Sequence, residues 1–407
     1  MSEQVRIDAV GRQGDGIAST PQGRVHVAYT LPGELVEIAR EGDRGTLLHI
    51  IEPSAERIAQ RCKHFGECGG CALEHWAAEP YLAWKRSLVA EALAREGVSA
   101  EVAQTMPAYG AGRIRAVFHS GRGAKKEAVG FAKRRSHEIV DLDECPVLAP
   151  LLEAALPLAR QLAKILLSTG KPIDLHVTVA ERGLDIDIRG PGKLPKPIES
   201  RVVSFAAEKK VLRISLHGEP LAQLMPPTHL IGSVRVTLPP APFLQATAEG
   251  ERVLAEKVMQ AAEGAKFAAD LFSGIGTFAL RLASKMKVSA FDNHEPSIAA
   301  LQAAAKSPGL KPVTASVRDL FRWPLVADEL KKIDLVVLDP PRVGAEAQTR
   351  ELAKSKVKKV AYVSCDADTF ARDAKTLVDG GFKLVAVTPV DQFQYSPHIE
   401  LVGVFKR

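Results

Sequence analysis

The stretch F-A-A-D-L-F-S-G-I-G-T-F-A-L-R-L-A, residues 267–283, decides the fold of this chain. An apolar run ends near Asp270, a turn with Gly274 and Gly276 follows, and an apolar helical pattern starts behind it. This succession of strand, glycine turn and helix is the repeating unit of doubly wound α/β sheets. The two glycines let the backbone bend sharply and let a ligand approach the main chain. Because the third glycine of G-x-G-x-x-G is missing, the turn indicates a nucleoside-sulfonium site rather than a dinucleotide site.

The same alternation continues from about residue 241 to the C-terminus and predicts a doubly wound parallel sheet. Many of its strand runs are apolar throughout, as expected for strands that are covered on both faces. The expected strands are residues 266–271, 288–291, 313–317, 333–338, 357–363, 382–387 and 401–405.

Acidic residues follow successive strands of this predicted sheet. Asp292 ends the second strand, 22 residues after Asp270. An acid at that spacing can accept hydrogen bonds from both hydroxyls of a ribose. Asp319 follows the third strand, where it is placed to contact an adenine amino group. The ordered set predicts a binding site for S-adenosylmethionine.

Three further chemical groups lie at the ends of later strands. Asp339 ends the fourth strand in L-V-V-L-D-P-P-R, and two prolines stiffen the loop behind it. Cys365 ends the fifth strand in V-S-C-D. Most free cysteines are small buried side chains with a structural role. A thiol at the end of a strand, however, can attack an electrophilic carbon. Glu400 begins the last strand, either as a solvated carboxylate or as a general base paired with that thiol.

The other four cysteines form a separate set. Cys62, Cys68 and Cys71 follow the spacing C-x5-C-x2-C, and Cys145 lies in D-L-D-E-C-P. Four thiolates saturate one tetrahedral metal or cluster site. The glycine-rich spacing and the cysteine–proline pair favour an iron–sulfur cluster over zinc, which is the alternative.

The first 57 residues show short apolar runs separated by turn signals such as P-Q-G and E-G-D-R-G. This pattern predicts a five-stranded barrel of a kind that often binds RNA, although a barrel that only packs on its neighbour fits equally well. A helix is expected at about 80–95, and another near 150–168. The proline-rich approach to Phe243 marks a domain boundary.

The composition fits a chain of 407 residues with two or three domains. The net charge of +6 is modest. The positive charge is locally concentrated, which fits either a polyanion-binding patch or a solvated basic surface. The residues concerned are Arg113, Arg115, Arg122, Lys125, Lys126, Lys133, Arg134 and Arg135. The N-terminus lacks a secretory pattern and no apolar run has transmembrane length, so a cytoplasmic, reducing location without membrane partners is expected.

With these motifs the chain resembles the RNA uracil-5 methyltransferase family, in its 23S ribosomal RNA branch. The resemblance covers nearly the whole chain and is most specific in the cysteine set, F-L-Q-A-T, D-L-F-S-G-I-G-T-F, D-P-P-R, V-S-C-D and H-I-E. It implies a TRAM (OB-like) barrel at 1–57, a central α+β iron–sulfur domain at 58–240, and a class I, Rossmann-like methyltransferase domain at 241–407. It also implies that the helix at about 78–97 packs on the catalytic domain.

The resemblance carries roles over to residues of this chain. It implies Cys365 as nucleophile, Glu400 as base, and a 4Fe-4S cluster on the four clustered cysteines. The cofactor S-adenosylmethionine would be surrounded by Gln245, Phe272, Gly274, Gly276, Thr277, Asp292, Asp319 and Asp339. Thr277 departs from the family, which usually has asparagine there.

The implied reaction makes 5-methyluridine in RNA. Cys365 adds to carbon 6 of uracil, carbon 5 takes the methyl group, and Glu400 removes the proton from carbon 5. A transfer RNA substrate is the nearest alternative, and a non-catalytic RNA-binding or ribosome-assembly factor is the alternative of another class. No obligate protein partner is inferred. A cytosine-5 enzyme would carry a cysteine in the D-P-P-R motif, and an amino-group enzyme an aromatic residue in place of Arg342.

Overall fold

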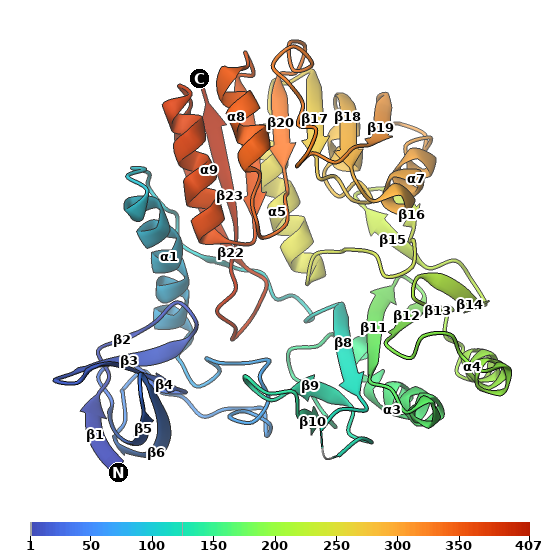
Figure 1. Ribbon diagram of the computed structural model, residues 1–407. Helices are drawn as coiled ribbons and strands as arrows, with labels where there is room; N and C mark the ends of the chain where they lie inside the picture. The colour runs from blue at the N-terminus through green and yellow to red at the C-terminus, as the bar shows by residue number, and fades with distance from the viewer. Residues whose placement is uncertain (1, 124) are drawn as a thin grey trace.

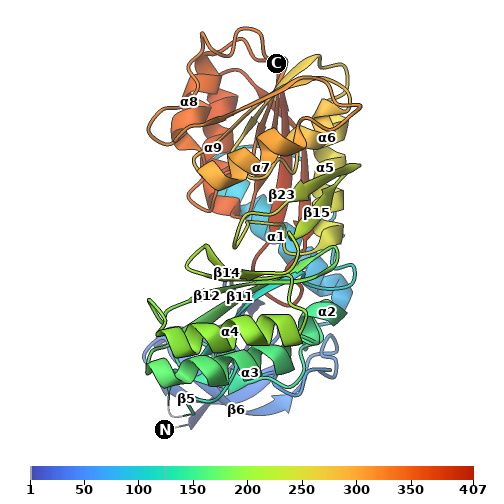
Figure 2. The same ribbon diagram turned by 90° about the vertical axis from the view of Figure 1, so that its right-hand side faces the viewer.

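The computed structural model describes residues 2–123 and 125–407 (Figure 1). The chain forms an N-terminal sheet, a central sheet covered by helices, and a large C-terminal sheet with helices on both faces (Figures 1 and 2). In the part of the chain that the model describes, no helix is both long and apolar enough to cross a membrane.

The N-terminal sheet has the strand order β1-β5-β6-β4-β3-β2. Its strands are β1 (Ser2–Arg6), β2 (Ala9–Val10), β3 (Asp15–Thr20), β4 (Gly23–Ala28), β5 (Leu35–Glu41) and β6 (Arg44–Glu52). Alternate apolar side chains, among them Val25, Val27, Val36 and Ile38, fill its interior. The sequence predicts an all-β unit with five strands, and the structure has six. The additional strand arises because the first segment of the chain forms two strands: β1 pairs with β5, and the short β2 that follows pairs with β3.

Helix α1 (Ala78–Arg95) comes before the central sheet in sequence but lies against the C-terminal sheet (Figure 1). Its buried Val89, Ala92 and Leu93 share one apolar core with residues of that sheet. The segment therefore ties the N-terminal half of the chain to the C-terminal half.

The central sheet has the order β10-β9-β8-β11-β12-β13-β14. Its strands are β8 (Arg115–Ser120), β9 (Gly130–Ala132), β10 (Ile139–Asp141), β11 (Ile173–Ala180), β12 (Gly183–Arg189), β13 (Arg213–Leu216) and β14 (Glu219–Gln223). The helices are α2 (Pro150–Glu153), α3 (Leu156–Leu166) and α4 (Lys196–Glu208). Figure 2 shows α3 and α4 on the face that points away from the C-terminal sheet, so the other face lies toward it. The hairpin β15 (Thr228–Ile231) and β16 (Val234–Thr237) follows.

The C-terminal sheet has the order β19-β18-β17-β20-β21-β23-β22-β7. Its strands are β7 (Met106–Pro107), β17 (Phe267–Leu271), β18 (Lys287–Asp292), β19 (Val313–Val317), β20 (Leu335–Leu338), β21 (Lys359–Ser364), β22 (Lys383–Asp391) and β23 (Glu400–Lys406). Its helices are α5 (Ala248–Ala261), α6 (Ala279–Ala283), α7 (Glu295–Ala304), α8 (Glu346–Lys354) and α9 (Ala367–Asp379).

Five neighbouring strands of this sheet, β17 to β21, are parallel, as predicted. The prediction of a wholly parallel sheet is wrong for β23, which is antiparallel to both β21 and β22. The chain passes from β22 to β23 through residues 392–399 without a crossover helix, so it returns in the opposite direction.

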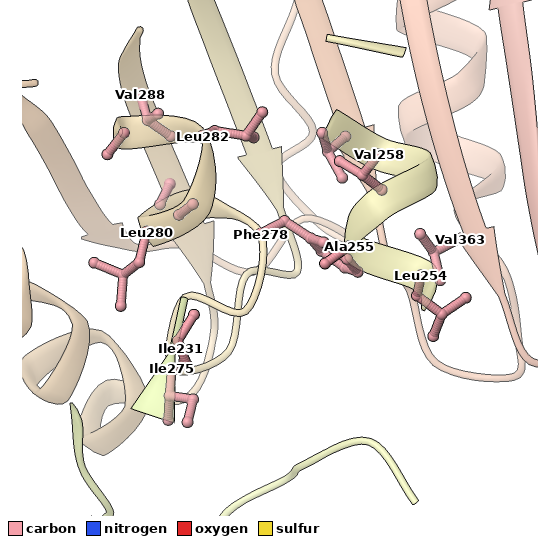
Figure 3. Close-up of a cluster of buried hydrophobic side chains, with 14 of the residues drawn as sticks. Ile231, Leu254, Ala255, Val258, Ile275, Phe278, Leu280, Leu282, Val288 and Val363 are labelled. Atoms are coloured by element: carbon pink, nitrogen blue, oxygen red, sulfur yellow. The ribbon is translucent and has the colours of Figure 1, made fainter. Parts of the chain in front are cut away.

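Two apolar cores hold the helices to this sheet, one on each face. Figure 3 shows part of the first core, where Phe278, just before α6, lies next to Ala255 of α5. Leu280 and Leu282 of α6 belong to the same core. The second core contains side chains of α1, α8 and α9. With both faces buried, the polar groups at the carboxyl ends of the parallel strands are left for ligands.

Candidate active site

Asp270 closes the glycine turn onto the helix that follows it. The side chain is fully buried, and its Oδ2 accepts a hydrogen bond of 2.7 Å from the Ala279 amide at the start of α6. Its Oδ1 finds no partner among the described residues. Burial, with Asp339 and Asp292 nearby, raises the pKa of Asp270 well above its usual value. Asp270 is therefore suited to shaping the turn.

The turn between β17 and α6 contains three residues in the left-handed region: Phe272 (φ 65°), Gly274 (φ 53°) and Gly276 (φ 95°). A Cβ on Gly276 would lie 2.5 Å from Leu301 Cδ1, so helix α7 packs against the turn there. A Cβ on Gly274 would meet none of the described atoms within 4 Å. The Gly274 side of the turn is thus open to a ligand.

Asp292 lies at the mouth of this turn, at the end of β18. Its carboxylate accepts hydrogen bonds from the amides of Gly274 (2.9 Å) and His294 (2.8 Å). A carboxylate has about four acceptor positions, so two remain for a ligand. The side chain is half-buried, which suits a group that binds polar hydroxyls.

Asp319 follows β19, and Phe272 follows β17 in the glycine turn. Asp319 accepts hydrogen bonds from the amides of Phe321 (3.0 Å) and Arg322 (3.2 Å). The rings of Phe272 and Phe321 have centroids 5.3 Å apart. An aromatic surface therefore adjoins the Asp319 carboxylate. Thr277 is half-buried in the glycine turn, where its carbonyl accepts a hydrogen bond from an arginine of α6.

A chain of side-chain amides reaches Asp339 from two other segments. Gln245 Nε2 donates to Asp339 Oδ2 over 3.5 Å, and Gln392 Nε2 donates to Gln245 Oε1 over 2.7 Å. Gln392 Oε1 in turn accepts the Ala246 amide at 2.9 Å. Burial, and Asp292 after it, raise the pKa of Asp339 to about 7. Gln392 was not singled out from the sequence; its only signal is a polar pair, D-Q, after an apolar strand.

The pairing of β21 with β23 places Cys365 near Glu400. Ser364 lies opposite Leu401 in that pair. Cys365 directly follows Ser364, and Glu400 directly precedes Leu401, so the two predicted catalytic residues lie next to each other at the same end of the strand pair. Burial raises the pKa of the Cys365 thiol to about 12, and the Glu400 and Asp339 carboxyls add to the effect. Burial, then Asp339, raises the pKa of Glu400 to about 8, while Arg115 and Arg342 lower it. The site thus holds a thiol beside a carboxyl group of unusually high proton affinity.

Cys365 lines a cavity of about 590 Å³. The walls come from three parts of the chain: Arg12 from the N-terminal sheet, Arg134 and Arg135 from the central region, and Arg342 with Cys365 from the C-terminal sheet. The nucleophile candidate therefore faces a strongly basic space. Arg134 and Arg135 belong to the basic run noted in the sequence, whereas Arg12 was not singled out.

A second cavity of about 360 Å³ lies between the central sheet and the C-terminal domain. Arg115 stacks over the ring of Phe243, 4.5 Å from its centroid, and Arg113 lies 5.8 Å from the ring centroid of Phe393. Phe243 is 61% exposed, which is unusual for a large aromatic side chain. Both arginines come from the basic run, so part of that run lines the interface of the two domains.

The four predicted metal cysteines line one small cavity. All four are free thiols in the described structure, and burial is the largest cause that raises the pKa of each, to about 12 for Cys145. No group of three or more His, Cys, Asp or Glu side chains in the described ranges is arranged to hold a metal ion. A single tetrahedral zinc ion would need thiolates within about 4 Å of one another, since each bond is about 2.3 Å. The cysteines are gathered, but not around one such point.

A buried ion pair anchors the loop that leads to Glu400. Asp391 accepts hydrogen bonds from Lys85 Nζ (2.9 Å), Tyr81 Oη (2.8 Å) and Tyr109 Oη (2.7 Å), and Lys85 and Asp391 are both fully buried. Lys85 also donates to the His398 carbonyl. Helix α1 is therefore fixed to both ends of the 392–399 loop.

The cysteine loop contacts the same loop. The amides of Ala72 and Leu73, directly after Cys71, donate to the Tyr395 carbonyl at 2.8 and 3.0 Å. Arg61 donates to the hydroxyl of Tyr395 at 2.8 Å. The cysteine loop and the 392–399 loop are thus joined by backbone hydrogen bonds.

Comparison with known proteins adds to this geometry. The family model described as tRNA (Uracil-5-)-methyltransferase matches residues 240–407. A Caulobacter vibrioides protein called an uncharacterized RNA methyltransferase is 48% identical over 100% of both chains. The 23S rRNA (uracil(1939)-C(5))-methyltransferase RlmD of Chromohalobacter salexigens is 30% identical over 100% of this chain and 90% of its own.

The solved structure of the Pyrococcus abyssi tRNA (uracil-54, C5)-methyltransferase, in complex with S-adenosyl-L-homocysteine, has a similar fold. Its TM-score is 0.75 at 22% identity, and the match covers 99% of each chain. The fold is thus shared along the whole chain, including the N-terminal sheet and the cysteine loop.

Proposed function

The chain belongs to the RNA uracil-5 methyltransferase family, and from this premise we propose that it makes 5-methyluridine in 23S ribosomal RNA through a covalent adduct with Cys365. The observation that carries the proposal is the placement of Cys365 and Glu400 on paired strands, beside Asp339, at the edge of the sheet where ligands bind. The S-adenosylmethionine that this family uses would supply the methyl group from its sulfonium.

The chain's own residues account for the remaining steps. The Cys365 thiol loses its proton, and the thiolate adds to carbon 6 of the uracil, which makes carbon 5 nucleophilic. After methyl transfer, Glu400 takes the proton from carbon 5, the bond between Cys365 and carbon 6 breaks, and the aromatic ring is restored. The target base must first leave its stack, at a cost of a few kcal/mol. The basic cavity in front of Cys365 offsets part of that cost through phosphate contacts.

We assign the cofactor contacts from the geometry of the strand ends. Asp292 has free acceptor positions for the ribose hydroxyls, and Asp319 with the aromatic pair beside it suits the adenine ring. The open face of Gly274 allows the cofactor to approach the main chain. Gln245 and Asp339 lie between this edge and Cys365, where the reacting groups meet.

We also propose that Cys62, Cys68, Cys71 and Cys145 hold a 4Fe-4S cluster. The donor set fits this group, because four free thiols, two of them buried, share one cavity and a 4Fe-4S cluster takes four cysteine ligands. The cluster would hold the loop and have no part in methyl transfer, since the reaction moves no electron. A brown protein with equimolar iron and sulfide supports it; a colourless, zinc-containing, fully active protein contradicts it.

The choice of ribosomal over transfer RNA rests on the named 23S relative. Because the solved transfer RNA enzyme shares the whole fold, the N-terminal barrel and the cysteine loop do not by themselves select ribosomal RNA. That enzyme class is the second candidate. A non-catalytic RNA-binding factor is less consistent with a thiol and a carboxyl group placed together at the strand ends.

The deciding experiment maps 5-methyluridine by mass spectrometry in ribosomal and transfer RNA from a strain that lacks this protein. Loss of one 23S site, restored by the wild type but not by Cys365→Ala, supports the proposal. Loss confined to transfer RNA keeps the reaction and replaces the substrate. No loss in either RNA contradicts the enzymatic function.

A further inference from the structure

The cavity in front of Cys365 is completed by parts of the chain that lie far outside the C-terminal domain. Arg12 comes from the connection between β2 and β3, and Arg134 and Arg135 come from the connection between β9 and β10. Arg342 comes from the loop after β20 and lies on the cavity wall with Cys365. A ligand in this space would touch all three parts of the molecule at once.

The ion pairs around this cavity leave positive charge uncompensated. The carboxylate of Asp15 is shared by Arg134 (2.6 Å) and Arg135 (2.7 Å). Asp368 is likewise shared by Arg12 and Arg95. Each carboxylate therefore neutralises one of its two guanidinium groups.

The remaining groups on the wall do not cancel this excess. Arg342 contacts the imidazole of His398 at 3.3 Å, which supplies no negative charge. Asp366 also lines the cavity, with its carboxylate engaged in capping α9 through the amides of Asp368 and Thr369. Four arginines and two carboxylates, those of Asp366 and Asp368, line the cavity, so its wall carries an excess of positive charge that suits an anion.

The arginine from the central region is held in place before any ligand arrives. The guanidinium of Arg134 is 5.6 Å from the ring centroid of Tyr29 and is bonded to Asp15. Its Nη1 is buried and has no hydrogen-bond partner within residues 2–123 and 125–407. A guanidinium that is fixed in this way on a cavity wall is preorganised for a phosphate.

We propose that Arg134, Arg135 and Arg342 bind a backbone phosphate of the RNA next to the target uridine. The proposal rests on the proposed function, because it takes RNA as the substrate and Cys365 as the reacting group. The N-terminal sheet contributes through Asp15, which orients the two central arginines, and through Arg12. The active site is therefore complete only when the N-terminal and central regions are docked on the catalytic sheet.

The test compares two changes that act in opposite directions on the same charge. The double variant Arg134→Gln/Arg135→Gln removes two cations, and Asp15→Asn removes the carboxylate that neutralises one of them. Arg252→Gln, on α5 at the other face of the C-terminal sheet and paired with two glutamates, is the control. The dissociation constant of a fluorescein-labelled oligouridine is measured by anisotropy over a range of salt concentrations, and methyl transfer to ribosomal RNA is measured in parallel.

We expect the double variant to bind the oligouridine at least tenfold more weakly, with a salt slope that is smaller by about 0.7 for each lost phosphate contact. Asp15→Asn should bind more tightly, because the amide oxygen can still accept a hydrogen bond that orients the arginines while the negative charge is lost. Arg252→Gln should match the wild type. If the double variant does not fold, Arg135→Gln alone, whose side chain is 39% exposed, replaces it. Weaker binding in both the arginine variant and Asp15→Asn, or an unchanged salt slope, would overturn the phosphate site. A wild type that binds RNA with these slopes but transfers no methyl group contradicts the proposed function and leaves the phosphate site standing.

Discussion

The cofactor edge of the site and its substrate edge are built in different ways. The cofactor edge that we propose, residues 267–323, is one continuous stretch of chain. Each of its strands ends beside a polar residue that we assign to the cofactor site. The substrate edge draws on Arg12, Arg134, Arg342, Cys365 and Glu400, which are scattered over the whole chain. The cofactor edge can thus tolerate changes elsewhere, whereas the substrate edge depends on how distant segments dock.

The largest effect is expected at the substrate edge, from Glu400→Gln. A general base typically contributes about 100- to 10,000-fold, so turnover should fall within that range. Addition of Cys365 does not need the Glu400 carboxylate, and a covalent RNA–protein complex should therefore accumulate. The measurement is a denaturing gel of enzyme, RNA and methyl donor. Cys365→Ala should give no such band, and a Glu400→Gln protein with normal turnover would mean that another group is the base.

The next largest effect is expected from Lys85→Met, which breaks the anchor of the 392–399 loop. Removing one partner of a buried ion pair costs about 3–5 kcal/mol of unfolding free energy, because the other charge stays buried. Urea unfolding measures this loss, and turnover should fall with it. Glu91→Gln, at an exposed position on the same helix, serves as the control.

A second variant separates stability from positioning in this anchor. Lys85→Met/Asp391→Leu replaces both charges by apolar groups, which is often neutral for stability. We expect it to regain part of the unfolding free energy but not the turnover, because the His398 carbonyl and the Tyr81 and Tyr109 hydroxyls have lost their partner. Recovery of both properties would reduce the pair to a structural role.

The contrast between the two edges also explains what the sequence could predict. The glycine turn, Asp292 and Asp319 were predictable, because each follows its own strand and parallel strands end at the same edge. The roles of Gln392 and of the Lys85–Asp391 pair were not, since their partners lie more than a hundred positions away in the chain. No local pattern marks a buried lysine on a helix as an anchor.

The antiparallel β23 is an intermediate case. Its apolar run was predicted as a strand, but the direction of a strand depends on the connection before it, and residues 392–399 form an eight-residue loop without a helix. The pairing that brings Cys365 and Glu400 together follows from that direction. The residues of the site were thus predictable from strand ends, while their proximity was a property of the tertiary fold.

At the cofactor edge, Asp292→Asn should lower the affinity for S-adenosylhomocysteine about tenfold. The amide can still accept the Gly274 N–H, but hydrogen bonds to a charged acceptor are worth about 1.5–3 kcal/mol, more than those to a neutral one. Isothermal titration calorimetry measures the change. Asp334→Asn is the matched control, because Asp334 accepts two backbone amides at the opposite end of β17. Equal losses in both variants would show that the effect comes from the fold rather than from the ligand.

A dependence on pH is also expected, and it should be confined to the substrate edge. The pKa of Glu400 is raised to about 8 by burial and by Asp339, so below that pH the group is mostly protonated and cannot accept the proton from carbon 5. The rate at which the methylated adduct breaks down should therefore rise about tenfold per pH unit between pH 6 and pH 7, and level off above pH 8. Rapid quenching of a preformed adduct isolates this step from the ionisation of Cys365, whose thiol is already consumed. Glu400→Gln should abolish the pH dependence of adduct breakdown. A flat wild-type profile between pH 6 and pH 8 would contradict the prediction, because it would show that Glu400 is already ionised in the complex and that burial does not govern its proton affinity there.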